Sequence, residues 1–151
     1  MSLLYTLSWA TLKLLIRVRF PQVKSLTVAE LAAWLNQSPP PLLLDARSPM
    51  EYQVSHLPNA QLAPANLSNW QPTICPTQPI VTYCSVGYRS AVLANQLRQH
   101  GFQQVWNLEG SIFEWANAGY PVYRQQQQVG QVHPYNALWG NLLRAELRSP
   151  N

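Results

Sequence analysis

Short apolar runs alternate with helix signals through the middle of this chain, and that alternation constrains the fold more than any other feature. Residues 42–44, 79–83 and 104–108 are apolar enough to form buried strands. Capping boxes at residues 27–30 and 48–51 predict helices over about 28–36 and 49–57. Further helices are predicted over residues 90–100 and 111–118. Strands that alternate with helices form a parallel sheet covered on both faces, so we predict an α/β domain.

The loop after the strand at residues 79–83 carries the chemistry. Its sequence is Cys84-Ser85-Val86-Gly87-Tyr88-Arg89-Ser90. Ligands of open α/β sheets bind beyond the carboxyl ends of the strands, which is where this loop must lie. Gly87 allows a tight curl in which backbone N–H groups converge on an anion, and the following helix adds the positive end of its dipole. A cysteine in that setting is expected to react as a thiolate rather than serve as a buried structural residue.

Three motifs resemble the single-domain rhodanese-like proteins over about residues 26–123, and along the chain they occur in the order found in that family. The first is Cys-x-x-Gly-x-Arg-Ser at residues 84–90. The second is Leu-Leu-Asp-Ala-Arg-Ser-Pro-Met-Glu-Tyr at residues 43–52, with His-Leu-Pro-Asn-Ala at 56–60. The third, Leu-Glu-Gly-Ser-Ile at residues 108–112 followed by Ala-Gly-Tyr-Pro-Val at 118–122, resembles the family's closing segment. Ser55, Asn59 and Ser111 stand where the family usually has glycine. The resemblance implies a three-layer fold with a central parallel sheet.

The resemblance also implies sulfur transfer. The Cys84 thiolate would attack the outer sulfur of a donor such as thiosulfate or a persulfide, hold it as a persulfide, and pass it to a thiophilic acceptor. The loop residues would bind and stabilise the anionic persulfide; they are Ser85, Val86, Gly87, Tyr88, Arg89 and Ser90. Because the protein itself carries the sulfur, we expect no metal and no organic cofactor. The partners expected are a small sulfur donor and a thiol or protein acceptor.

Two other functions remain open. Related phosphatases and arsenate reductases use a loop one residue longer than the six residues from Cys84 through Arg89, which makes those activities less favoured. A non-catalytic domain for docking, or for redox or persulfide sensing, is the main alternative. It is motivated by the segments outside the domain and by a loop whose one basic residue, Arg89, makes thiosulfate a less suitable donor.

Several polar residues near the predicted site have a structural explanation. Asp45 and Arg47 end the first predicted strand and are expected to brace the catalytic loop. Arg47 and Glu51 are four residues apart at a helix start, a spacing typical of an ion pair. Arg89 either contacts the substrate anion or pairs with an acid, and the sequence favours neither. His56 is interpreted as a turn residue that makes a backbone hydrogen bond rather than as a general base.

The charge distribution excludes one class of partner. Charged residues make up 11% of the chain, and the net charge is +4. Residues 1–24 hold four basic side chains and no acidic one, while charges balance over the rest of the chain. The domain therefore has no basic surface for nucleic acid. Cys75 and Cys84 are too few for a disulfide framework and lack zinc-site spacing, which favours a reducing, cytoplasmic location.

The N-terminal arm, residues 1–25, precedes the rhodanese-like domain at 26–124. Its apolar run is short for a membrane span and has no basic region before it, so it is neither a typical span nor a secretion signal. At about 100° per residue, Lys13 and Arg17 lie on one side of a helix. The apolar residues opposite them are Leu4, Leu7, Leu14, Leu15 and Val18. We expect this helix to pack on the domain or on a second copy. The alternative is weak binding of residues 3–19 to an anionic membrane surface, which would make the protein membrane-peripheral.

The C-terminal tail, residues 125–151, is predicted to be largely helical. Leu138, Leu142, Leu143 and Leu147 form one stripe of a helix over residues 136–148. We expect that stripe to pack on the domain. The glutamines at 125–128 are interpreted as a connector.

Overall fold

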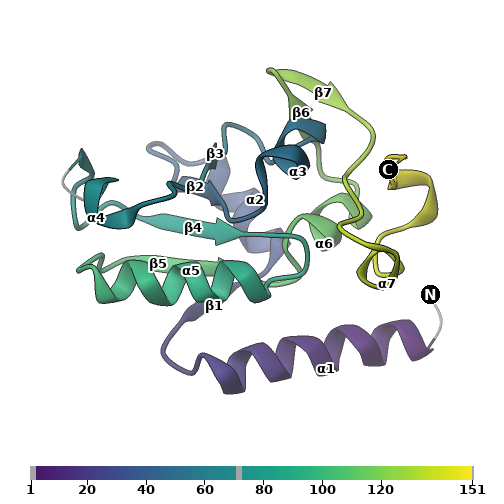
Figure 1. Ribbon diagram of the computed structural model, residues 1–151, viewed down its shortest axis with the longest axis horizontal. Coiled ribbons are helices and arrows are strands. Elements are labelled where there is room, and N and C mark those ends of the chain that lie inside the picture. Colours follow the sequence, from purple (N-terminus) through teal and green to yellow (C-terminus); the bar gives the residue numbers. More distant parts are fainter. Residues whose placement is uncertain (1–2, 71–72, 151) are drawn as a thin grey trace.

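A five-stranded parallel sheet forms the centre of the molecule. The computed structural model describes residues 3–70 and 73–150. The strand order is β1-β5-β4-β2-β3 (Figure 1). The strands are β1 (Lys24–Leu26), β2 (Leu42–Asp45), β3 (Gln61–Leu62), β4 (Ile80–Tyr83) and β5 (Val105–Leu108). The predicted α/β fold is confirmed, and the three predicted strands form the middle of this sheet.

Helices cover both faces of the sheet. One core cluster joins Leu43 and Val81 to α2 (Val28–Leu35) and α6 (Ser111–Asn117). The other cluster joins Leu44 and Ile80 to α5 (Tyr88–Gln99), with α4 (Leu67–Trp70) packed against it. Both predicted capping boxes are present, at the starts of α2 and of α3 (Pro49–Val54). The alternation of apolar residues along β2 and β4 therefore produces the three layers.

The N-terminal helix α1 (Leu3–Arg19) packs on the domain with a different face from the one the sequence predicts. It runs beside α5 (Figure 1), where Ile16 and Phe20 are buried with Ala91. Lys13 pairs with Glu114 at 2.8 Å and Arg17 with Glu109 at 2.6 Å, so the basic side faces the domain. The helix has two apolar sides, and these ion pairs decide which one is covered.

The predicted apolar stripe of α1 faces outward instead. Leu14, Leu15 and Val18 are 60%, 62% and 70% exposed. The side chains of Leu4 and Leu7, which were predicted to share this stripe, lie outside the described residues. Within residues 3–70 and 73–150, the length and hydropathy of every helix fall short of what crossing a bilayer requires.

The C-terminal segment departs from the predicted single helix. It begins with a hairpin of β6 (Val122–Arg124) and β7 (Gln127–Val129), so the glutamines at 125–128 form a turn and a strand rather than a connector. Two short pieces follow, α7 (Ala137–Gly140) and the 3₁₀ helix η2 (Ala145–Leu147). The Asn117 side chain donates to Leu142 O and accepts from Arg144 N, both at 2.9 Å. These bonds occupy backbone groups that a continuous helix would need, which explains the interruption.

Candidate active site

The structure places Cys84 directly after the central strand β4, at the carboxyl edge of the sheet. Its side chain is 1% exposed. The backbone N–H of Gly87 donates to Cys84 Sγ at 3.1 Å, and Ser90 Oγ lies 3.4 Å from the same sulfur. The single hydroxyl proton of Ser90 goes to Asn107, so the Gly87 amide is the donor that faces the sulfur. Such a donor stabilises negative charge on that sulfur in a site with little water.

Gly87 shapes the loop. Its φ of +115° lies in the left-handed region, which side chains with a Cβ rarely adopt. The residue also caps α5, so the N-terminal end of a 12-residue helix begins at the loop. A Cβ at this position would lie 3.5 Å from the Ile16 side chain of α1. The curl predicted from the glycine is therefore present, and α1 packs against it.

Asn107 and Ser111 hold the loop from the neighbouring strand and helix, a role that was not predicted for either residue. Asn107 accepts from Ser90 Oγ at 2.6 Å and donates to Gly87 O at 3.0 Å. Ser111 Oγ accepts from the Cys84 backbone N–H at 3.1 Å. The available signal for Asn107 was an amide in an otherwise buried strand, because a buried polar side chain needs a partner.

Arg89 pairs with an acid inside the protein. Its guanidinium donates to both carboxylate oxygens of Glu51, at 3.0 and 2.9 Å, and to Ser85 Oγ at 2.9 Å. Burial of the Glu51 carboxyl raises its pKa, but hydrogen bonds from Arg89 and the Ser48 backbone lower it further, to about 2. The carboxylate is therefore ionised at neutral pH and offsets the charge of Arg89.

The predicted ion pair between Arg47 and Glu51 is wrong. Arg47 turns back to Asp45, with Nη2 at 2.6 Å from Oδ2, and also donates to Ser55 O at 2.7 Å. The same Asp45 oxygen accepts from the hydroxyl of Tyr83 at 2.6 Å. Burial and the Asp45 carboxylate raise the pKa of Tyr83 well above its usual value, which keeps the hydroxyl protonated. Because Tyr83 precedes Cys84, this buried cluster holds the strand end from which the loop starts.

His56 makes the backbone contact expected for it, and Cys75 lies away from Cys84. His56 Nδ1 lies 2.9 Å from Leu57 O, and its ring stacks on Tyr52 at 4.3 Å. Cys75 is an exposed free thiol before β4, whereas Cys84 follows that strand and is buried. A four-residue strand is about 13 Å long, far beyond the reach of a disulfide. Among the described residues, His, Cys, Asp and Glu side chains form no group of three that could hold a metal ion.

A small cavity of about 180 Å³ lies over Cys84. Its described lining residues are Leu12, Cys84, Ser85, Val86, Tyr88, Arg89, Tyr135 and Trp139. Three of them come from outside the loop: Leu12 from α1, and Tyr135 and Trp139 from the C-terminal segment. The Tyr135 ring lies 4.3 Å from the Arg89 guanidinium carbon. We call this cavity the Cys84 pocket.

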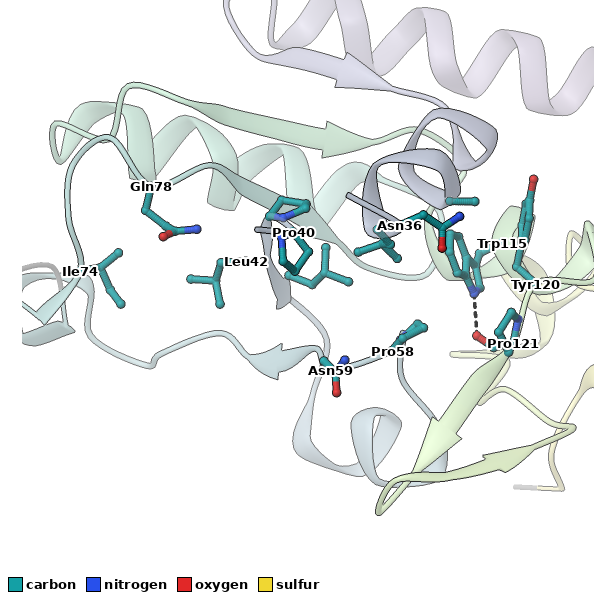
Figure 2. Close-up of a pocket in the computed structure, with 14 residues that line it drawn as sticks. Asn36, Pro40, Leu42, Pro58, Asn59, Ile74, Gln78, Trp115, Tyr120 and Pro121 are labelled. Carbon is teal, nitrogen blue, oxygen red and sulfur yellow. Dashed lines mark hydrogen bonds between the residues drawn. The ribbon is translucent and has the colours of Figure 1, made fainter. Parts of the chain in front are cut away.

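A larger cavity of about 700 Å³ lies near the amino ends of β2 and β4, at the edge opposite Cys84 (Figure 2). Leu42, Pro58, Gln78, Trp115 and Tyr120 line it, and Trp115 Nε1 donates to a neighbouring carbonyl at 2.8 Å. None of its described lining residues is a cysteine, a histidine or a charged residue. The larger cavity thus offers no nucleophile, whereas the smaller Cys84 pocket contains a buried thiol with a hydrogen-bond donor beside it.

Comparisons with known proteins match the part of the chain that contains this site. A family model described as "Rhodanese-like domain" matches residues 27–118. The chain is 32% identical over 100 residues to a probable adenylyltransferase/sulfurtransferase, MoeZ, of Mycobacterium tuberculosis. It is 36% identical over 98 residues to a tRNA uridine(34) hydroxylase of Cronobacter sakazakii. These matches cover 64% and 60% of this chain but only 26% and 28% of the relatives.

A solved structure of a rhodanese-like domain protein from Staphylococcus aureus superimposes with a TM-score of 0.59 at 27% identity. The superposition covers 69% of this chain and all of that one. The family match includes the Cys84 loop, whereas α1 and the segment after α6 lie outside it.

Proposed function

Because the chain belongs to the family of rhodanese-like domains, we propose that it is a sulfurtransferase that carries sulfane sulfur as a persulfide on Cys84. The observation that supports this most directly is the geometry at Sγ. A buried thiol at the carboxyl end of β4 receives a hydrogen bond from Gly87 N, and Ser90 Oγ lies beside it. The Gly87 amide and the start of α5 can stabilise the negative charge of a persulfide formed there. A relative named in part as a sulfurtransferase, MoeZ, adds support.

The proposed reaction has two displacement steps. In the first, the Cys84 thiolate attacks the outer sulfur of the donor, a new S–S bond forms at Sγ, and the donor's own bond to that sulfur breaks. The leaving group is sulfite when thiosulfate is the donor, and it is the parent thiol when a hydropersulfide is the donor. In the second, the electron pair of a thiophilic acceptor attacks the outer sulfur. The S–S bond then breaks, and its electron pair returns to Sγ as the thiolate. No metal or organic cofactor takes part.

Each supporting residue has a physical role in this cycle. Asn107 fixes Ser90 Oγ and Gly87 O, and so holds the loop in its curl around the sulfur. Glu51 holds the Arg89 guanidinium at the base of the loop. A thiolate nucleophile stays reactive in a reducing compartment, and the cytoplasm is the location that suits this chemistry.

The structure also bears on the alternatives. A phosphatase loop needs a cation free to bind a dianion, yet Arg89 is held by Glu51 and Ser85. Phosphoryl transfer is therefore less favoured than sulfur transfer. A docking or sensing domain would keep the same loop without turnover, so only an activity measurement separates it from an enzyme.

Turnover with cyanide as the acceptor tests the proposal. The purified full chain is supplied with thiosulfate, and separately with an alkyl hydropersulfide, and thiocyanate is measured. We expect turnover by the native protein with at least one donor, the same rate for Cys75→Ser, and only the uncatalysed rate for Cys84→Ser. Turnover that survives in Cys84→Ser would exclude Cys84 as the sulfur carrier. A persulfide that forms without turnover would favour the sensing domain.

A further inference from the structure

The segments that flank the family domain build part of the Cys84 pocket. Leu12, Tyr135 and Trp139 all lie outside the residues that match the family, yet they line the pocket together with the catalytic loop. The N-terminal half of α1 and the short helix α7 approach each other at this end of the molecule (Figure 1). A domain of residues 27–118 alone would leave Cys84 more open. These segments therefore give this chain a pocket of its own.

The anchoring of both segments is extensive. Leu12 and Ile16 on α1 and Phe20 directly after it follow one another at four-residue spacing, and they lie in turn against the pocket, Gly87 and Tyr88. The C-terminal segment is held by Val132 and Leu143, both fully buried in the main core. The walls of the pocket thus belong to the packed structure and not to loose ends.

The pocket is small and carries almost no net charge. A volume of about 180 Å³ equals that of roughly six water molecules. Arg89 is the only charged side chain among the described residues that line it. Glu51 binds that guanidinium with both oxygens and Tyr135 covers it, so little positive charge remains for a ligand. An anion with two charges would lose its hydration there without gaining a counter-charge.

We propose that the Cys84 pocket selects a low-molecular-weight organic hydropersulfide, with an apolar body and at most one negative charge, over thiosulfate. This inference rests on the proposed function. The Cys84 thiolate attacks the outer sulfur of R–S–S–H, and the bond between the two donor sulfurs breaks. R–S⁻ leaves and takes the proton that the outer sulfur carried, which yields R–SH and Cys84–S–S⁻. The alkyl group R lies against Leu12, Tyr135 and Trp139, and its burial supplies the binding free energy.

The rate at which Cys84 gains sulfur, followed by intact-protein mass, tests the donor preference. We expect a butyl hydropersulfide to load the native protein at least about tenfold faster than thiosulfate at equal concentration. Thiosulfate loading that is equally fast would overturn the inference while leaving the proposed function intact. If neither donor loads Cys84, the proposed function itself fails. The two failures are therefore distinguishable without any variant.

Variants then test the walls. Trp139→Ala should slow loading by the hydropersulfide about fivefold and change loading by thiosulfate less than about twofold, because only the alkyl group contacts the indole. Leu138→Ala, in the same helix but 72% exposed, is the matched control and should change neither rate. Leu12→Lys adds a cation to the wall and should speed thiosulfate loading about fivefold. A donor ratio unchanged in both Trp139→Ala and Leu12→Lys would contradict the assignment of these walls.

The outer face of α1 independently supports a second inference. Leu3, Leu14, Leu15 and Val18 lie on one side of this helix and are 75%, 60%, 62% and 70% exposed. Exposed apolar side chains gathered as Leu14, Leu15 and Val18 are, within one turn of a helix, are typical of an interaction surface. Arg19 is exposed at the carboxyl end of α1, and Lys24 is exposed at the start of β1. Each cation lies over an aromatic ring, Phe20 or Trp106, and makes no ion pair with a described residue. No acidic residue precedes Glu30.

We propose that this face of α1 binds the surface of a membrane containing anionic lipid. The apolar stripe would enter the interface while the cations contact the headgroups. A second copy of the chain is less suited to the same face, because its own cations would meet those of the first.

Flotation with vesicles tests this proposal on the full chain. We expect the native protein to float with vesicles of phosphatidylcholine and phosphatidylglycerol, and to stay behind with phosphatidylcholine alone. A triple variant, Leu14→Gln, Leu15→Gln and Val18→Gln, changes exposed positions only and should abolish flotation without loss of Cys84 loading. Native protein that stays behind with anionic vesicles would contradict the proposal. A concentration-dependent dimer that the triple variant abolishes would assign the face to a second copy instead.

Discussion

Arg89, in the loop that follows Cys84, and Glu51 form a bidentate ion pair, with N–O distances of 3.0 and 2.9 Å. The pair joins the start of α5 to α3, and Ser85 Oγ bridges its two members. Arg89 is the one basic residue of the loop, and this contact makes its charge part of the folded structure. The pair therefore links the stability of the site to its preference among donors.

Glu51→Gln should separate these two effects. The amide retains the shape of the side chain but removes the counter-charge, so we expect unfolding to require about 2 kcal/mol less free energy. This is below the range for a fully buried pair because Arg89 is partly exposed. The freed cation should also speed loading by thiosulfate. Urea denaturation and intact mass measure the two effects, and slower thiosulfate loading in a folded variant would contradict this role of Glu51.

The low pKa of Glu51 predicts a defined loss of stability in acid. Its pKa falls from 4.5 to about 2 in the folded protein, so the folded state favours the ionised form. The resulting stabilisation is complete above pH 4.5 and is lost as the pH falls from there towards 2. Urea denaturation over this range should show a steeper decline for the native protein than for Glu51→Gln. Parallel curves would contradict the assignment.

Gly87→Ala and Gly101→Ala form a matched pair. Both glycines have a positive φ, +115° and +94°, so each alanine should destabilise the fold by about 1 kcal/mol. Only Gly87 donates a hydrogen bond to Cys84 Sγ. We therefore expect Gly87→Ala to slow the loading of Cys84 at least about tenfold and Gly101→Ala to leave it unchanged. Equal loading rates in the two variants would show that the curl of the loop is dispensable.

Asn107→Ala should loosen the loop around Cys84 without contacting the cysteine itself. The variant loses the bonds to Ser90 Oγ and Gly87 O, which position both groups that face the sulfur. We expect sulfur loading to slow about tenfold, while the variant remains folded by circular dichroism. Asn141→Ala, at an exposed position on the C-terminal segment, is the control. Unchanged loading in Asn107→Ala would remove this residue from the site.

The sequence predicted the middle of the sheet because those strands are continuous apolar runs. Ile80 and Val81 are fully buried, and apolar residues of that kind are read directly from composition. The edge strands β1 and β3 have three and two residues and include exposed polar side chains, so no local pattern marks them. Their pairing with β5 and β2 is a tertiary effect.

The predictions for side chains failed where partners distant in sequence decide the outcome. Glu51 pairs with Arg89, 38 residues away, instead of with Arg47. The inward face of α1 depends on Glu109 and Glu114, which lie about 100 residues further along the chain. Motif and spacing therefore identify Cys84 and its loop, whereas the walls of its pocket become visible only in three dimensions.

The most direct test of the account is the mass of the intact protein after incubation with an alkyl hydropersulfide, with Cys84→Ser and Cys75→Ser as the comparison. We predict that the native protein and Cys75→Ser each gain one sulfur atom, that dithiothreitol removes it, and that Cys84→Ser gains none. No gain by the native protein from this donor or from thiosulfate, or an equal gain by Cys84→Ser, would contradict the assignment of Cys84 as the sulfur carrier.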